Sequence, residues 1–160
     1  MTPSTLTPMA YSTAVARQEM LDAIAEAIDG IAVALAALGE AYELVDDSTG
    51  DRLEGELFRP VQLAYGRAKR THAEFAARYD LPARTFAPAA PGHPSQGVKG
   101  FLDGAVHAIA AADAKLAILQ DSMMTIEVGD AELRTGLSEV RRLANEVPGR
   151  TRLFVRTLGR

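Results

Sequence analysis

The side chains best suited to metal or acid–base chemistry in this sequence are His72, His93 and His107. A di-iron four-helix protein needs Glu-x-x-His on two helices, but none of these histidines has a Glu three positions earlier. The His-x-x-x-His and His-Glu-x-x-His spacings of zinc enzymes are also missing. The chain has no cysteine, so thiolate ligands and thiolate nucleophiles are excluded. We therefore expect neither a metal site nor a cofactor.

Carboxylates gather on one side of the first expected helix, where Glu19, Asp22, Glu26 and Asp29 follow at steps of three and four. Hard cations such as Ca²⁺ bind where several oxygens converge on one point. These four carboxylates are instead spread along a helix, opposite its apolar side. We interpret them as a solvated surface.

Arg67 and His72 have the spacing Arg-x-x-x-x-His. This spacing resembles the motif of HEPN ribonuclease domains, which are also helical bundles, and the resemblance implies RNA cleavage by these two residues. It covers six residues only. Ala68 stands where that family commonly has a polar residue, and the motif falls in the second expected helix instead of near the last. An HEPN-like ribonuclease using Arg67 and His72 is therefore kept as an alternative function.

The elements that must position these residues are visible as apolar seams, in which apolar residues alternate steps of three and four and so share one helix face. The first seam is Leu21, Ile24, Ile28, Ile31, Leu35, Leu38, Tyr42 and Val45. The second is Phe58, Val61, Tyr65, Ala68, His72, Phe75 and Tyr79. The third is Leu102, Ala105, Ile109, Ala112, Leu116, Leu119, Met123 and Ile126. The fourth is Leu133, Leu137, Val140, Ala144 and Val147.

These seams predict one domain over residues 1–160 with helices at about 8–45, 51–80, 95–128 and 130–147, and a short C-terminal helix at 150–158. A polar turn at 46–50 and a strap at 81–94 connect them. Pro60 predicts a kink or break in the second helix, and Pro148-Gly149 an interruption of the fourth. Two helical hairpins joined by a strap predict an all-α, antiparallel up-down-up-down four-helix bundle with long helices. Asp130 is the expected N-cap of the fourth helix.

His72 occupies a seam position, with Tyr65, Phe75 and Tyr79 on the same stripe. We expect its imidazole to be buried and to bond to a tyrosine hydroxyl or a backbone carbonyl. Burial should lower the pKa of His72. In the alternative reading, these four residues line a pocket for a planar ligand, and the protein is a small-molecule-binding bundle.

A face of small residues marks the third expected helix. Its members are Gly97, Gly100, Gly104, Ala108, Ala111 and Ala114. Glycine inside a helix costs about 1 kcal/mol relative to alanine, so a close approach must offset the loss. That approach is either within the chain, for example against Phe86 of the strap, or at a subunit interface. Ile118 and Met124 lie off the seam and would otherwise be exposed, which favours a homo-oligomer, most simply a homodimer.

Charge is unevenly divided along the chain. Residues 1–57 carry 11 acidic residues and two arginines, whereas residues 58–160 carry 15 basic and 10 acidic residues. The C-terminal part ends with Arg150, Arg152, Arg156 and Arg160. This end could hold an anion, but we favour pairing with acidic residues or solvation, and nucleic acid is not a favoured partner.

The remaining features point away from membranes and towards a binding role. No apolar run approaches the ~20 residues of a membrane helix, and no secretory signal is visible. We expect a cytoplasmic protein, and its Arg- and Ala-rich composition is typical of a GC-rich bacterial genome. The favoured function is a non-enzymatic interaction or structural subunit that associates with itself or with a protein partner.

Overall fold

The computed structural model describes residues 8–90 and 97–158, with side chains from residue 13 onward. The described residues are helical and contain no strand. The long helices are α1 (Pro8–Glu43), α3 (Arg59–Arg78), α4 (Gly97–Asp121) and α6 (Ala131–Leu158). Shorter elements are α2 (Asp47–Leu53), the π-helical turn η2 (Glu54–Phe58) and α5 (Met124–Glu127). None of the described helices combines the length and apolar composition needed to cross a membrane.

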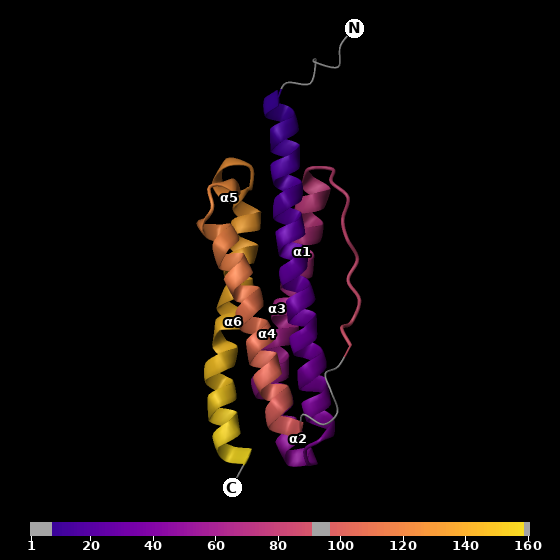
Figure 1. The fold of residues 1–160 in the computed structure, drawn as a ribbon, viewed down its shortest axis with the longest axis vertical. Coiled ribbons are helices and arrows are strands. Elements are labelled where there is room, and N and C mark those ends of the chain that lie inside the picture. The colour runs from indigo at the N-terminus through magenta and orange to yellow at the C-terminus, as the bar shows by residue number, and fades with distance from the viewer. Residues whose placement is uncertain (1–7, 91–96, 159–160) are drawn as a thin grey trace.

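The four long helices lie side by side along the long axis of the molecule (Figure 1). Helices α1 and α6 run in one direction and α3 and α4 in the other, because the strap after α3 runs back along the molecule before α4 begins. The predicted up-down-up-down order is therefore wrong: the long connection between the two hairpins leaves α3 and α4 parallel. The most extensive packing joins α1 to α4 and α3 to α6, and α4–α6 and α1–α3 contacts complete the arrangement. Each long helix therefore packs on two others, and the core lies between all four.

The core is built from the predicted seams. Ile24, Ile28 and Ile31 of α1 are fully buried, as are Leu102 of α4 and Leu137 of α6. One contiguous apolar cluster includes residues from all four long helices and from η2. Burial of large aliphatic side chains on one stripe of each helix is what holds the helices together.

Helix formation around Pro60 takes a form that the sequence did not predict. Asp46 caps α2 by accepting a 2.7 Å hydrogen bond from the Thr49 amide, so the second hairpin arm starts at Asp47 and not at 51. The helix widens into the π turn just before Pro60, where the Arg59 amide donates to the Glu54 carbonyl five residues back. A single wide turn accommodates the proline ring and its missing amide, and the arm runs without a break to Arg78.

The expected interruption at Pro148 is wrong, and there is no separate helix at 150–158. Helix α6 continues from Ala131 through Pro148 to Leu158. The chain is buried on both sides of the proline: Val147 directly before it, and Thr151 and Phe154 after it. Core packing on both sides of Pro148 outweighs the loss of one helical hydrogen bond.

The third expected helix ends earlier than its seam suggested. Helix α4 stops at Asp121, and a separate short α5 follows. The Ser122 hydroxyl donates to the Leu119 carbonyl at 2.6 Å, and such local bonds compete with helical ones. Met123 and Ile126 were placed in the seam, but they are 60% and 63% exposed, and Thr125 is buried instead.

Tyr42, the penultimate member of the first seam, is also exposed, with its ring 3.1 Å from where a Gly50 Cβ would lie.

The described part of the strap, residues 81–90, runs along the outside of α1 and α3 (Figure 1). Leu81 and Phe86 are half-buried against the core. Arg84 forms an ion pair with Asp29 of α1 at 2.6 Å, and its guanidinium lies 4.7 Å from the centre of the Phe86 ring. Phe86 therefore attaches the strap to the helices.

Candidate functional site

Helix α4 has a second, outer face, opposite the one it contributes to the core. Gly104, Ala111, Ala114 and Ile118 lie on it at helical spacing, and we call these four residues the α4 outer stripe. Ala111 and Ala114 are exposed, and Ile118 is 73% exposed. A Cβ added at Gly104 would meet no atom of the described chain within 4 Å. Within the described chain, therefore, no close approach explains the glycine at 104.

Other members of the predicted small-residue face have roles inside the chain. The Ala108 carbonyl lies 3.7 Å from where a Gly30 Cβ would be, at the contact between α1 and α4. Gly97 begins α4 with φ +70°, a conformation that favours glycine, so it is not an interior helix residue. Gly100 is half-buried near that end. Met124 was expected to be exposed, but it is half-buried against the core because α4 ends before it.

A close approach of two helices lies at a glycine that the sequence analysis did not single out. A Cβ on Gly136 of α6 would overlap the Thr71 side chain of α3. The Thr71 hydroxyl turns back along its own helix and donates to the Arg67 carbonyl at 2.8 Å. Both residues are buried, so Gly136 lets α3 and α6 pack with threonine between them.

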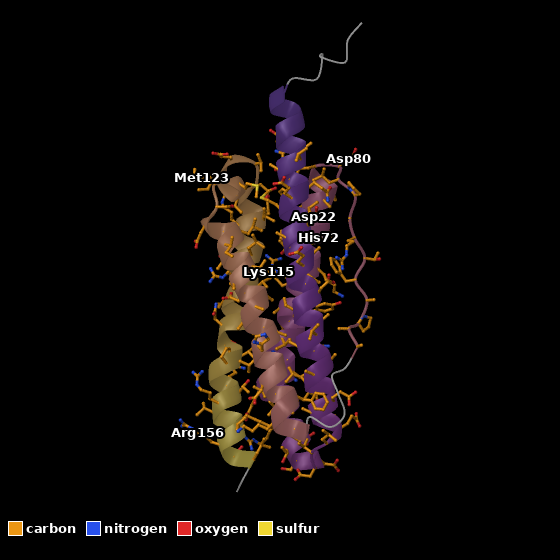
Figure 2. All side chains as sticks on the ribbon, viewed as in Figure 1. Asp22, His72, Asp80, Lys115, Met123 and Arg156 are labelled. Carbon is orange, nitrogen blue, oxygen red and sulfur yellow. The ribbon has the colours of Figure 1, made fainter. Side chains whose placement is uncertain are left out.

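The His72 imidazole is 2% exposed, which confirms the predicted burial (Figure 2). Its neighbour is Phe86 of the strap, in an edge-to-face contact with ring centres 5.2 Å apart. The expected hydrogen bond to a tyrosine or a carbonyl is absent: Nδ1 of His72 has no partner in the described chain. The strap therefore covers His72 with the ring of Phe86. This ring has no oxygen or nitrogen that could serve as the predicted hydrogen-bond partner.

Burial lowers the pKa of His72, and the positive charge of Arg84 lowers it further, while Asp22 acts weakly in the opposite direction. The direction agrees with the sequence-based expectation. A neutral imidazole is thus the form that the folded chain accommodates.

The aromatic residues predicted to surround His72 face two different environments. The Tyr65 ring carries the Lys69 ammonium 4.3 Å from its centre and borders a cavity of about 250 Å³ under Pro88 and Ala89. Phe75 and Tyr79 pack on each other, with ring centres 4.8 Å apart. That cavity is not lined by His72, so these four side chains do not form one shared pocket.

Arg67 and His72 are also directed to different neighbours. Arg67 pairs with Glu139 of α6 at 3.1 Å, whereas His72 faces Phe86 on the strap side of α3. Five residues along an α-helix correspond to a rotation of roughly 140°, which separates the two side chains. The structure does not bring this pair together.

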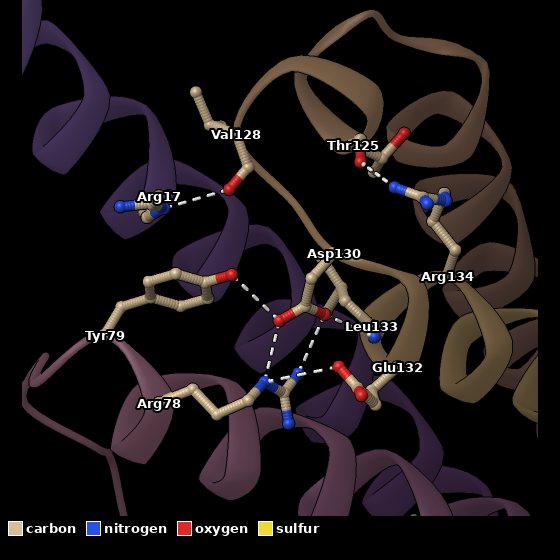
Figure 3. A network of polar contacts seen from close by, with 9 residues as sticks. All are labelled: Arg17, Arg78, Tyr79, Thr125, Val128, Asp130, Glu132, Leu133 and Arg134. Carbon is tan, nitrogen blue, oxygen red and sulfur yellow. Dashed lines mark hydrogen bonds and ion pairs between the residues drawn. The ribbon is translucent and has the colours of Figure 1, made fainter.

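A polar junction joins the ends of three helices (Figure 3). Arg78 donates two hydrogen bonds to the Asp130 carboxylate, at 2.7 and 2.9 Å, and the Tyr79 hydroxyl donates a third at 3.0 Å. Asp130 also caps α6 by accepting from the Leu133 amide at 2.8 Å, as predicted. Arg17 of α1 lies 3.8 Å from the Tyr79 ring centre and donates to the Val128 carbonyl. Only the cap was visible in the sequence, because the other partners are remote along the chain.

The charges at this junction stabilise one another. Burial opposes ionisation of Asp130, but the hydrogen bonds from Arg78, the Leu133 amide and Tyr79 outweigh it and lower the pKa of Asp130. Burial and the bond to Asp130 raise the pKa of the Tyr79 hydroxyl. A bidentate arginine–carboxylate pair with a helix cap is a structural clamp, and it leaves no free nucleophile or base.

Within the described ranges, no group of three or more His, Asp or Glu side chains is arranged to hold a metal ion. No protein-family model matches the chain, and neither a curated protein nor a solved structure matches it. We take the α4 outer stripe as the candidate site, since it combines the exposed Ile118 side chain with an open position at Gly104 on one side of α4.

Proposed function

We propose that this chain is a four-helix bundle that acts as a non-enzymatic interaction subunit and forms a homodimer in the cytoplasm. The packing of α1, α3, α4 and α6 around one core, with each packed pair antiparallel, supports the bundle class. The α4 outer stripe supports the self-association. A protein partner on the same face is the second possibility within this class.

The main support is the spacing within the stripe. Gly104, Ala111 and Ile118 are each seven residues apart, which brings them to the same side of α4 after two turns. The large exposed side chain of Ile118 and the open space at Gly104 lie at equal distances from Ala111. A stripe that has a knob at one end and a hole at the other complements an antiparallel copy of itself.

The resulting dimer is isologous, with a two-fold axis at Ala111. Ile118 of each subunit packs over Gly104 of the other, and the two Ala111 methyl groups meet at the axis. Burial of Ile118 in both subunits provides the driving force. Glycine and alanine let the two helices approach to the lower end of the usual ~8–10 Å interaxial distance.

Surrounding residues extend the same surface. Val33 of α1, three residues from Gly30 at the α1–α4 contact, is 46% exposed. Lys115 pairs with Glu26 of α1 at 3.2 Å beside the stripe, so its charge is already matched. An apolar strip with a polar border is the usual composition of a protein interface.

Disulfide trapping tests this arrangement, because the chain has no cysteine of its own. Ala111→Cys puts one thiol at the proposed two-fold axis, where paired α-carbons of small residues can come within the ~4.4–6.8 Å that a disulfide spans. We expect rapid formation of a covalent dimer under mild oxidation. Ala73→Cys is the matched control, since Ala73 is exposed on α3, away from α4. Equal cross-linking of the two variants would contradict the proposed interface.

A further inference from the structure

A groove of about 560 Å³ lies between the first half of α4 and the last third of α6. Its apolar lining comes from Val106 and Ala110 on one wall and from Pro148 and Val155 on the other. The volume is within the range of small-molecule sites, which are typically ~300–1,000 Å³ and mostly apolar with a few polar groups.

The polar lining includes Arg152 and Arg156 of α6 and His107 of α4. Most arginines of the described chain have a partner: they form ion pairs, hydrogen bonds or ring contacts. Arg59, Arg152 and Arg156 form none of these within the described residues. Two of the three arginines without a partner therefore line the same groove.

The sequence of α6 explains why the two guanidinium groups stay free. Arg152 has Pro148 four residues before it and Arg156 four residues after it, so neither neighbour on its face is acidic. Glu146 is already paired with Arg142 and Arg150 at 3.2 Å. Like charges at this spacing destabilise a helix slightly, and an anion bound between them would relieve the repulsion.

The guanidinium groups in the groove lie next to apolar residues. The Arg152 Nη2 atom lies 3.6 Å from where a Gly149 Cβ would be, so this guanidinium lies along its own helix beside Pro148. Asp103 is the acidic residue in the lining, and it forms no ion pair with either arginine in the described chain. The two arginines outnumber it, and the groove is net positive.

We propose that this groove binds a small organic phosphate, a phosphate monoester with an apolar body. The phosphate lies between Arg152 and Arg156, whose planar guanidinium groups bind phosphate oxygens in pairs. The imidazole of His107 faces it from α4, and the apolar body packs on Val106, Pro148 and Val155. This groove adjoins the proposed homodimer contact, because His107 lies between Gly104 and Ala111 on the same side of α4.

Isothermal titration of the whole chain with phenyl phosphate, and separately with inorganic phosphate, tests the proposal at constant salt. We expect saturable binding of phenyl phosphate and at least several-fold weaker binding of inorganic phosphate, because only the ester uses the apolar lining. The Arg152→Gln/Arg156→Gln double variant should raise the Kd of phenyl phosphate by roughly tenfold or more. Arg59→Gln is the matched control and should leave the Kd unchanged, since Arg59 is also unpaired but does not line the groove.

The proposal is overturned if phenyl phosphate shows no saturable binding. It is also overturned if the Arg152→Gln/Arg156→Gln double variant and the Arg59→Gln control change the Kd of phenyl phosphate equally. Equal affinity for phenyl phosphate and inorganic phosphate would overturn the assignment of an organic ligand. The titration is repeated with Ile118→Ala, which should weaken the homodimer and lies outside the groove lining. Unchanged binding by that variant is expected for a site within one chain, and its loss would contradict such a site.

Discussion

Phe86 of the strap lies edge-on against the buried His72 imidazole of α3, with ring centres 5.2 Å apart. The contact closes the strap over a side chain whose Nδ1 has no hydrogen-bond partner in the described chain. An unpartnered polar atom in a buried site lowers stability, and a charged imidazole there would lower it further. The His72–Phe86 contact therefore makes the folded chain sensitive to the protonation of a single side chain.

Replacing this imidazole should remove part of the acid sensitivity of folding. The pKa of His72 is lowered in the folded state, so below the ordinary value of about 6.5 the unfolded chain binds a proton that the folded chain does not. Wild-type stability should fall by up to about 1.4 kcal/mol per pH unit as the pH drops from about 6.5 toward the folded pKa. His72→Phe should lack this loss and keep an aromatic contact with Phe86, as measured by urea unfolding between neutral and mildly acidic pH.

The control for this measurement is His107→Gln, because His107 is an exposed histidine on α4. It should retain the acid-dependent loss of the wild type. Parallel pH profiles for the wild type and His72→Phe would show that His72 titrates freely, against the burial described above.

The contact of Gly136 with Thr71 predicts a destabilising substitution of glycine by alanine. A methyl group at 136 overlaps the Thr71 side chain, so Gly136→Ala should lower the free energy of unfolding by roughly 1–3 kcal/mol. Gly66 lies on the exposed side of α3, where a Cβ would meet open space. Gly66→Ala should therefore raise the free energy of unfolding by about 0.5–1 kcal/mol. Chemical denaturation of both variants checks the two opposite signs.

A double-mutant cycle identifies the cause of the loss at Gly136. Thr71→Ala shortens the side chain that the new methyl group meets, so the combined variant should be more stable than additivity predicts. Strict additivity of the two changes would mean that the α3–α6 approach at this point is not limiting.

Asp130 should contribute more to stability than an ordinary helix cap. Asp130→Ala removes the cap of α6 together with the Arg78 and Tyr79 hydrogen bonds, and we expect a loss of about 2–3 kcal/mol. Asp46→Ala removes only the cap of α2 and should cost clearly less. Thermal or urea unfolding at neutral pH compares the two variants, and equal losses would show that the remote contacts add nothing.

The stability difference between the wild type and Asp130→Ala should depend on pH with a defined sign. Because the pKa of Asp130 is lowered in the folded state, its contribution is present above the ordinary value of 3.8 and is lost as the pH falls through the folded pKa. The gap between the wild type and Asp130→Ala should therefore narrow in strong acid.

Most of the fold could be predicted because the seams are local patterns. The stripe from Leu21 to Leu38 specifies which side of α1 is apolar, whatever lies opposite, and burial follows. The expectation that a proline ends a helix was wrong at Pro148, because tertiary packing decides there. Phe154 beyond Pro148 is buried in the core, and α6 continues. The seam of the third helix also ran too far, since Ile126 fits the spacing but follows the end of α4.

The sites were harder to predict, because they depend on which helices become neighbours. The burial of His72 followed from its register, but its contact with Phe86 depends on the path of the strap. Gly136 gave a signal as a lone glycine within a helix, yet its partner Thr71 could not be inferred from spacing. Gly104 stood out in the sequence as a glycine within a helix, and the structure shows that a Cβ there would meet no side chain of the described chain within 4 Å.

The molar mass of the wild-type chain in solution, measured by light scattering over about a hundredfold range of concentration, tests the proposed homodimer most directly. We predict a mass of twice the 17.1 kDa of one chain at the upper concentrations, with a shift toward one chain on dilution. Gly104→Leu should move this transition to higher concentration, because its side chain fills the space that Ile118 of the partner subunit occupies, whereas Gly66→Leu should not. A wild-type mass of one chain throughout, or equal effects of the two leucine variants, would contradict self-association through α4.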